Sequence, residues 1–207
     1  MLLDSAILFT AFITLFVIID PIGLAPLFVA LTQGQTTAQR RRVAITACLV
    51  AAVILTAFGL LGDAVLEFAG ISMPAFRIAG GVLLFLTALD MLFERRTKRR
   101  EGQSRTNEDD PSVFPLAIPL IAGPGAIATV ILLTNQNEGD WTWVVAVLAV
   151  MLAVLLVTFL FFLLANPIER LLGPVGINVV TRLLGMLLAA LSVQFVLDGL
   201  RAVGFGG

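Results

Sequence analysis

Apolar residues run along this chain in six long stretches, separated by short polar segments. The stretches cover approximately residues 5–31, 43–61, 74–93, 114–134, 141–165 and 179–200. Each is close to the roughly 20 residues that a helix needs to cross a hydrocarbon core of about 30 Å. The pattern therefore predicts an all-α integral membrane protein with six transmembrane helices.

Two of these stretches contain proline and glycine at positions where an uninterrupted helix would not. The first reads Asp-Pro-Ile-Gly at residues 20–23, and the fourth reads Ala-Gly-Pro-Gly at residues 122–125. Proline lacks the amide hydrogen that a helix interior needs and glycine weakens a helix, so we expect helices 1 and 4 to be broken. Freed backbone groups cannot face lipid, so each break is a candidate lining for a solute site.

The two halves of the chain resemble each other beyond these breaks. A shift of 103 residues relates Pro21 to Pro124, and a shift of 105 relates Arg77 to Arg182, each arginine followed three residues later by glycine. Because each half holds an odd number of spans, the second half enters the membrane from the opposite side, which makes an inverted repeat. We expect one membrane domain over 1–207, with three-helix repeats at 1–93 and 114–207 and a hydrophilic loop at 94–113.

Charge distribution predicts the orientation. Lysine and arginine occur in the loops after spans one, three and five, whereas the loops after spans two and four carry acids without lysine or arginine. By the positive-inside rule, the loop at 94–113 is cytoplasmic and both termini are periplasmic. Trp141 and Trp143 open span five, where an aromatic anchor at the outer interface is expected.

Composition narrows the function classes. With 59% hydrophobic and 13% charged residues, the chain is too apolar for a soluble domain, and nothing in it supports nucleic-acid binding. There is no histidine and one cysteine, Cys48, so we expect no metal site. No Walker A loop is present to couple ATP, and no cofactor is expected.

Asp20 is the most informative side chain, because an ionisable group within a span costs roughly 2.5 to 3.5 kcal/mol at a helix centre. One interpretation is that Asp20, with Pro21 and Gly23, binds a cation, a proton or a substrate ammonium group. The other is that its carboxylate caps a half-helix that begins at Pro21. The two roles can coexist.

The second break has no matching acid, because Gly123 stands where Asp20 stands in the first. The backbone amides of Gly123, Gly125 and Ala126, at a half-helix that begins near Pro124, would favour a carboxylate. An acid in one break and bare amides in the other suit a zwitterion. The alternative interpretation is close helix packing through small residues.

Other polar residues are weaker candidates. Arg77, Arg182, Thr87, Ser192 and Gln194 could act in gating or coupling, although the arginines could equally extend to lipid head groups. Hydroxyls near the breaks, at Thr10, Thr14, Thr129 and Thr134, are expected mostly to bond their own backbone.

The two proline-glycine motifs, with Pro26, the run at 118–127 and the repeated Arg-x-x-Gly, resemble the MarC family of bacterial inner-membrane proteins over essentially the whole length. The resemblance implies six spans and a bacterial inner-membrane location, and it groups the chain with LysE-type amino-acid exporters.

We therefore expect a secondary transporter of small neutral amino acids or similar zwitterions, working by alternating access. The direction of transport and the coupling ion are left open, with a proton and a sodium ion as the candidates. Its partners would be the lipid bilayer and the solute, and an oligomer is left open. The alternatives are a channel or passive pore and a membrane protein with a structural or regulatory role. An enzyme is not expected, since no nucleophile, base and orienting group recur near the breaks.

Overall fold

The regular elements that the structure describes are all helices. The computed structural model describes residues 5–93, 111–137 and 139–205. In chain order, the helices are α1 (Ser5–Ile19), α2 (Pro21–Leu31), α3 (Thr37–Phe68), α4 (Met73–Leu92), the irregular helical segment η1 (Ser112–Ile121), α6 (Pro124–Thr134), α7 (Trp141–Leu163) and α8 (Ala165–Ala202). Within η1, Phe114 and Ile118 have extended backbone angles. The predicted all-α fold is confirmed for these residues, and most of the predicted loop at 94–113 lies outside them.

Helical segments long and apolar enough to cross a membrane match the six predicted stretches. Five are Ala6–Leu31, Thr37–Phe68, Met73–Leu92, Trp141–Leu163 and Val175–Ala202. The consecutive helices η1 and α6 make a sixth if the pair, bent by 55° at its junction, is counted as one span.

Two helices are longer than their apolar stretches. α3 starts at Thr37 rather than near residue 43, because the side chain of Thr36 accepts from the amide of Gln39 and the Gln39 side chain accepts from the amide of Thr36. At 1.5 Å per residue its 32 residues span about 48 Å, more than the hydrocarbon core. α8 starts at Ala165 rather than near 179, and Gly173, with a φ of 62°, bends it before the span at Val175.

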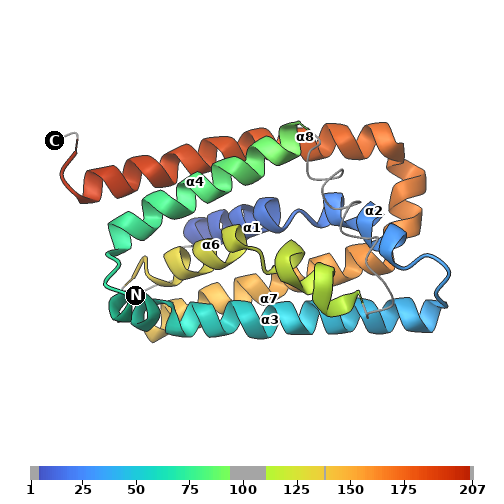
Figure 1. The fold of residues 1–207 in the computed structure, drawn as a ribbon, viewed down its shortest axis with the longest axis horizontal. Coiled ribbons are helices and arrows are strands. Elements are labelled where there is room, and N and C mark those ends of the chain that lie inside the picture. Colours follow the sequence, from blue (N-terminus) through green and yellow to red (C-terminus); the bar gives the residue numbers. More distant parts are fainter. Residues whose placement is uncertain (1–4, 94–110, 138, 206–207) are drawn as a thin grey trace.

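The helices form three layers (Figure 1). α4 and α8 lie along one side, α3 and α7 along the other, and α1, α2 and α6 lie between them. Buried side chains fill the middle of this arrangement, among them Leu15, Ile19, Leu24 and Phe28 of the central layer. The residues at which α1 gives way to α2 therefore lie inside the protein rather than against lipid.

Glycine brings α4 and α8 into close contact. A Cβ added at Gly81 would lie 2.8 Å from the backbone oxygen of Ser192, and one at Gly199 would lie 3.0 Å from the backbone oxygen of Pro74. Neither distance leaves room for a methyl group, so the backbones approach as closely as they do because these residues are glycine. Small residues permit the same packing between transmembrane helices in general.

Aromatic side chains connect α7 to the central layer. The rings of Phe28 and Phe162 stack with centroids 4.6 Å apart, and the indole nitrogen of Trp143 donates to the backbone oxygen of Leu133 at 2.8 Å. Trp143 is 2% exposed, so the prediction that it anchors the interface is wrong, whereas Trp141 is 71% exposed. Residues two apart on a helix face nearly opposite directions, so only one of the pair can point outward.

Candidate functional site

At the first break, Asp20 separates α1 from α2. Its backbone is left-handed, with φ 55° and ψ 62°, and its carboxylate oxygen Oδ1 accepts a hydrogen bond from the amide of Gly23 at 3.0 Å. Aspartate is one of the few residues other than glycine that adopts this conformation readily. With Pro21 at the first helical position, Asp20 is the N-cap of α2, so the capping role is present.

Gly23 is required by this cap for a steric reason. A Cβ at position 23 would overlap the Asp20 carboxylate. The glycine therefore makes room for the acid, which is 1% exposed and buried in the middle of the protein. The sequence had predicted that Gly23 weakens the helix and belongs, with Asp20 and Pro21, to a binding site, but it gave no sign of this steric requirement.

The second break has different chemistry. η1 ends at Ile121 and α6 begins at Pro124, with Gly123 as N-cap, and no side chain in the described part of the chain bonds to this helix start. A Cβ at Gly123 would lie 2.5 Å from the backbone oxygen of Pro119. Gly123 is half-buried and Pro124 is exposed, while Gly125 and Ala126 are buried. The start of α6 thus offers amides without a capping side chain.

The structure brings the end of α1 against the second break. A Cβ at Gly125 would lie 3.7 Å from Cγ2 of Ile18, 3.0 Å from Cδ2 of Leu84 and 3.9 Å from the hydroxyl of Thr87. Ile18 precedes Asp20 by two residues, so the two breaks are neighbours. Ile18 and Leu84 carry no signal in the sequence that marks them as site residues.

Thr87 is the gate candidate that this arrangement brings to a break. Its hydroxyl donates to the backbone oxygen of Leu83 at 3.0 Å and faces Gly125. Ser192, its partner in the predicted repeat, is fully buried, donates to the oxygen of Ala189 at 2.6 Å and lies against Gly81 of α4.

The other gate candidates lie along α4 and α8. Gln194 is exposed and donates to Asp198 at 2.8 Å. Arg77 is half-buried near the start of α4, and Arg182 is exposed on α8. The hydrogen bond of Gln194 stays within α8 rather than reaching either break.

Thr129 behaves differently from Thr10 and Thr134. Thr10 donates to the backbone oxygen of Ala6, and Thr134 donates to those of Val130 and Ile131, as the sequence predicted. Thr129 is 0% exposed, and its hydroxyl has no hydrogen-bond partner among the described residues. It lies one helical turn after Gly125, so an unsatisfied hydroxyl lies close to the uncapped start of α6.

Two hollows lie away from the breaks. One, of about 180 Å³, lies at the ends of α3, α6 and α7 that meet near Trp141, and its lining includes Asp63, Asn135 and Asp140. The other, which we name the α3–α7 groove, has a volume of about 260 Å³. It is lined by Ile45, Cys48, Leu49 and Ala52 of α3 and by Leu152, Leu155, Leu156 and Phe159 of α7.

Helices in this number and of this hydropathy define a multi-pass integral membrane protein. The chain belongs to the MarC family: the family described as MarC family integral membrane protein matches residues 5–203. The family predicted from the two proline-glycine motifs is thereby confirmed.

Relatives occur in archaea and bacteria. The chain is 40% identical to a UPF0056 membrane protein of Archaeoglobus fulgidus, over 93% of this chain and 91% of the relative. It is 36% identical to the UPF0056 membrane protein YhcE of Escherichia coli, over 97% and 94%, and 37% identical to YvbG of Bacillus subtilis, over 93% of each. No solved structure matches the chain.

Proposed function

We propose that the protein is a secondary transporter of small zwitterions, such as neutral amino acids, with its site between the two breaks. The observation that carries this proposal is the unequal capping of two neighbouring helix starts. A buried carboxylate caps α2, whereas no described side chain caps α6. An unequal pair of this kind offers one partner to each charge of a zwitterion.

The start of α6 is the partner for the solute carboxylate. The amides of Gly125 and Ala126 follow a proline at the first turn, where helix amides lack intrahelical acceptors and the helix dipole favours negative charge. The unsatisfied hydroxyl of Thr129, one turn on, adds a neutral donor. Asp20 would take the solute ammonium group or a coupling proton or sodium ion.

The two breaks support an inverted repeat and alternating access. α2 and α6 each contain 11 residues and begin with proline, and each follows a break in its span. Asp20 is buried and Pro124 is exposed, so the two breaks differ in exposure. Solute exchange would then require the halves to move relative to each other, which gives access from each side in turn.

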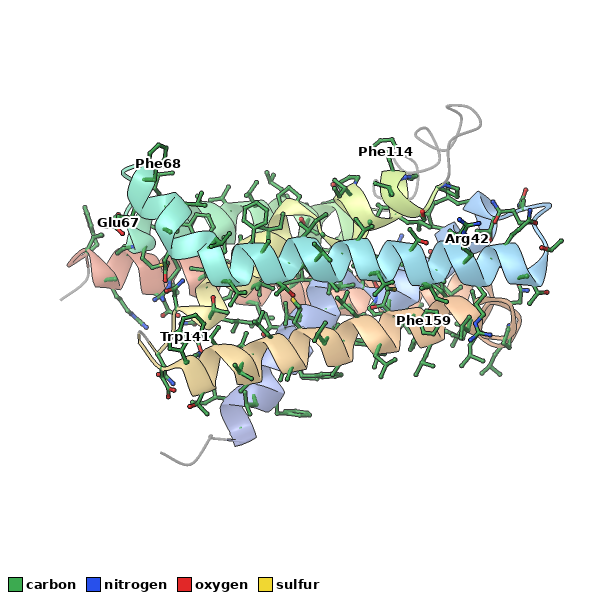
Figure 2. The ribbon with its side chains drawn as sticks, turned by 90° about the horizontal axis from the view of Figure 1, so that it is seen from below. Arg42, Glu67, Phe68, Phe114, Trp141 and Phe159 are labelled. Atoms are coloured by element: carbon green, nitrogen blue, oxygen red, sulfur yellow. The ribbon has the colours of Figure 1, made fainter. Side chains whose placement is uncertain are left out.

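Charge at the ends of the helices supports an inner-membrane orientation with both termini periplasmic. Arg42 lies at one end of α3, and Glu67 lies at its other end, near Trp141 of α7 (Figure 2). The arginine end would face the cytoplasm by the positive-inside rule.

Asp20→Asn tests the site. Asparagine caps helices about as well as aspartate and tolerates the left-handed conformation, so this variant loses the charge and keeps the cap. Reconstituted in liposomes, it should show at least tenfold slower counterflow of radiolabelled neutral amino acids than the wild type, with an unchanged unfolding temperature. Asp20→Ala, which loses the cap as well, should also lower that temperature.

Two results would count against the proposal. Counterflow by Asp20→Asn equal to that of the wild type across pH and sodium concentration would remove Asp20 from the transport mechanism. Single-channel conductance without saturable counterflow would favour a pore instead of a transporter.

A further inference from the structure

The α3–α7 groove has an apolar lining in a surface that faces the membrane. Ile45, Leu49 and Leu152 along it are 38%, 60% and 49% exposed, and the lining is almost entirely hydrocarbon. From position 45 to position 52 of α3 the groove is about 10 Å long, which fits within one leaflet of a hydrocarbon core about 30 Å thick. Its length and its volume of about 260 Å³ suit part of one acyl chain.

Two arginines stand at one end of this groove. Arg41 and Arg42 precede Ile45 by four and three residues, so both lie one helical turn beyond the groove and near its face of α3. Both are exposed, and neither forms an ion pair with another described residue. Arg42 and Phe159 lie toward the same end of the α3–α7 pair in Figure 2.

The third arginine of this run has a different role. Arg40 lies over the ring of Phe28, 5.6 Å from its centroid, and Phe28 is 1% exposed. Its contact is with the protein interior, as its position on the helix requires. Arg41 and Arg42 are therefore the cations left to face the membrane at this end of α3.

We infer that the α3–α7 groove binds an anionic phospholipid, with an acyl chain between the two helices and the phosphate at Arg41 and Arg42. The chain of any phospholipid could fill the groove, but only a net negative head group gains from two guanidinium groups that form no ion pair with a described residue. The lipid belongs to the leaflet on the arginine side. This inference does not depend on transport by the two breaks.

Native mass spectrometry of the purified protein tests whether the groove prefers a lipid with a negatively charged head group. With phosphatidylglycerol and phosphatidylcholine offered in competition, the wild type should retain one phosphatidylglycerol preferentially. In the double variant Arg41→Gln/Arg42→Gln, the preference for phosphatidylglycerol should fall by about 30-fold. Each basic residue near a head group contributes roughly fivefold to the preference, and this variant removes two of them. Arg201→Gln, which removes an exposed arginine from the far end of α8, should leave the preference unchanged.

Substitutions that fill the groove test whether an acyl chain binds there. Ala52→Trp places a large ring in the groove and should reduce retention of both lipids, whereas Ala190→Trp, the same change at an exposed position of α8, should not. Phosphatidylglycerol with a photoreactive acyl chain should crosslink to peptides containing residues 45–52 or 152–159. An unchanged preference in the arginine variant, full retention in Ala52→Trp, or crosslinks confined to other helices would overturn the inference.

Discussion

Each of the three glycines at the two breaks lacks a side chain for a different structural reason. Gly23 leaves space for the carboxylate of Asp20, Gly123 leaves space for the backbone oxygen of Pro119, and Gly125 lets Ile18 and Leu84 approach α6. Only contact with the surrounding atoms distinguishes these roles. The sequence predicted all of these residues to lie at the breaks and offered close packing through small residues as one interpretation of the second break, but it named no neighbour for any of the glycines.

These different contacts predict different costs for adding one methyl group. Gly123→Ala should destabilise the protein by about 1–3 kcal/mol, because its Cβ would meet a backbone oxygen at 2.5 Å that cannot move by a rotamer change. Gly125→Ala should cost less than about 1 kcal/mol, because its tightest contact, at 3.0 Å, is the flexible end of Leu84. Thermal unfolding in detergent compares the two, and a larger loss for Gly125→Ala would contradict the steric explanation.

At the scale of elements, α4 and α8 pack closely against each other, and the two helices are antiparallel. Gly199 meets Pro74 near the start of α4, and Gly185 meets Met91 near its end. The positions of Arg77 and Arg182 near opposite ends of this pair are compatible with the predicted inverted repeat. The equivalence of the two halves stays a prediction.

Close packing of this pair can be tested by one substitution and a matched control. Gly81→Ala should lower the unfolding free energy by about 1–3 kcal/mol, since its Cβ would lie 2.8 Å from the oxygen of Ser192 and 3.1 Å from the nitrogen of Val196. Gly176→Ala, in α8, would meet only Leu172 of the preceding turn and should be close to neutral. Equal effects of the two substitutions would mean that helix propensity, rather than packing against α4, decides the outcome.

For the whole molecule, the three-layer arrangement places the two breaks between the α4–α8 pair and the α3–α7 pair (Figure 1). The helix starts of α2 and α6 then face protein, apart from the exposed Pro124. Backbone groups released at mid-membrane are tolerated in such surroundings.

The orientation of the molecule gives a prediction at this scale. Alkaline phosphatase, which is active only outside the cytoplasm, should be active when fused after residue 207 and inactive when inserted within residues 94–113. Green fluorescent protein does not become fluorescent when it is exported unfolded, so it reports a cytoplasmic position and should give the reverse pattern. Activity of the phosphatase at 94–113 would overturn the orientation derived from the arginines.

The class of protein, the family, the apolar stretches that give five or six candidate spans, and the residues at which α1 and η1 end follow from the sequence. These properties depend on local quantities: the hydropathy of about 20 consecutive residues, the missing amide of proline and the motif letters themselves. The same local information correctly placed Asp20 before a helix beginning at Pro21 as a candidate cap.

Only the tertiary structure decided which side chains meet. Trp143 is buried while Trp141 is exposed, Thr87 faces Gly125, and Thr129 has a hydroxyl that no described residue satisfies. Each outcome depends on the rotation of a helix about its axis and its register against neighbours. In a chain that is 59% hydrophobic, the pattern leaves rotation and register weakly specified, because nearly every helical face is apolar. Packing against the other helices settles both.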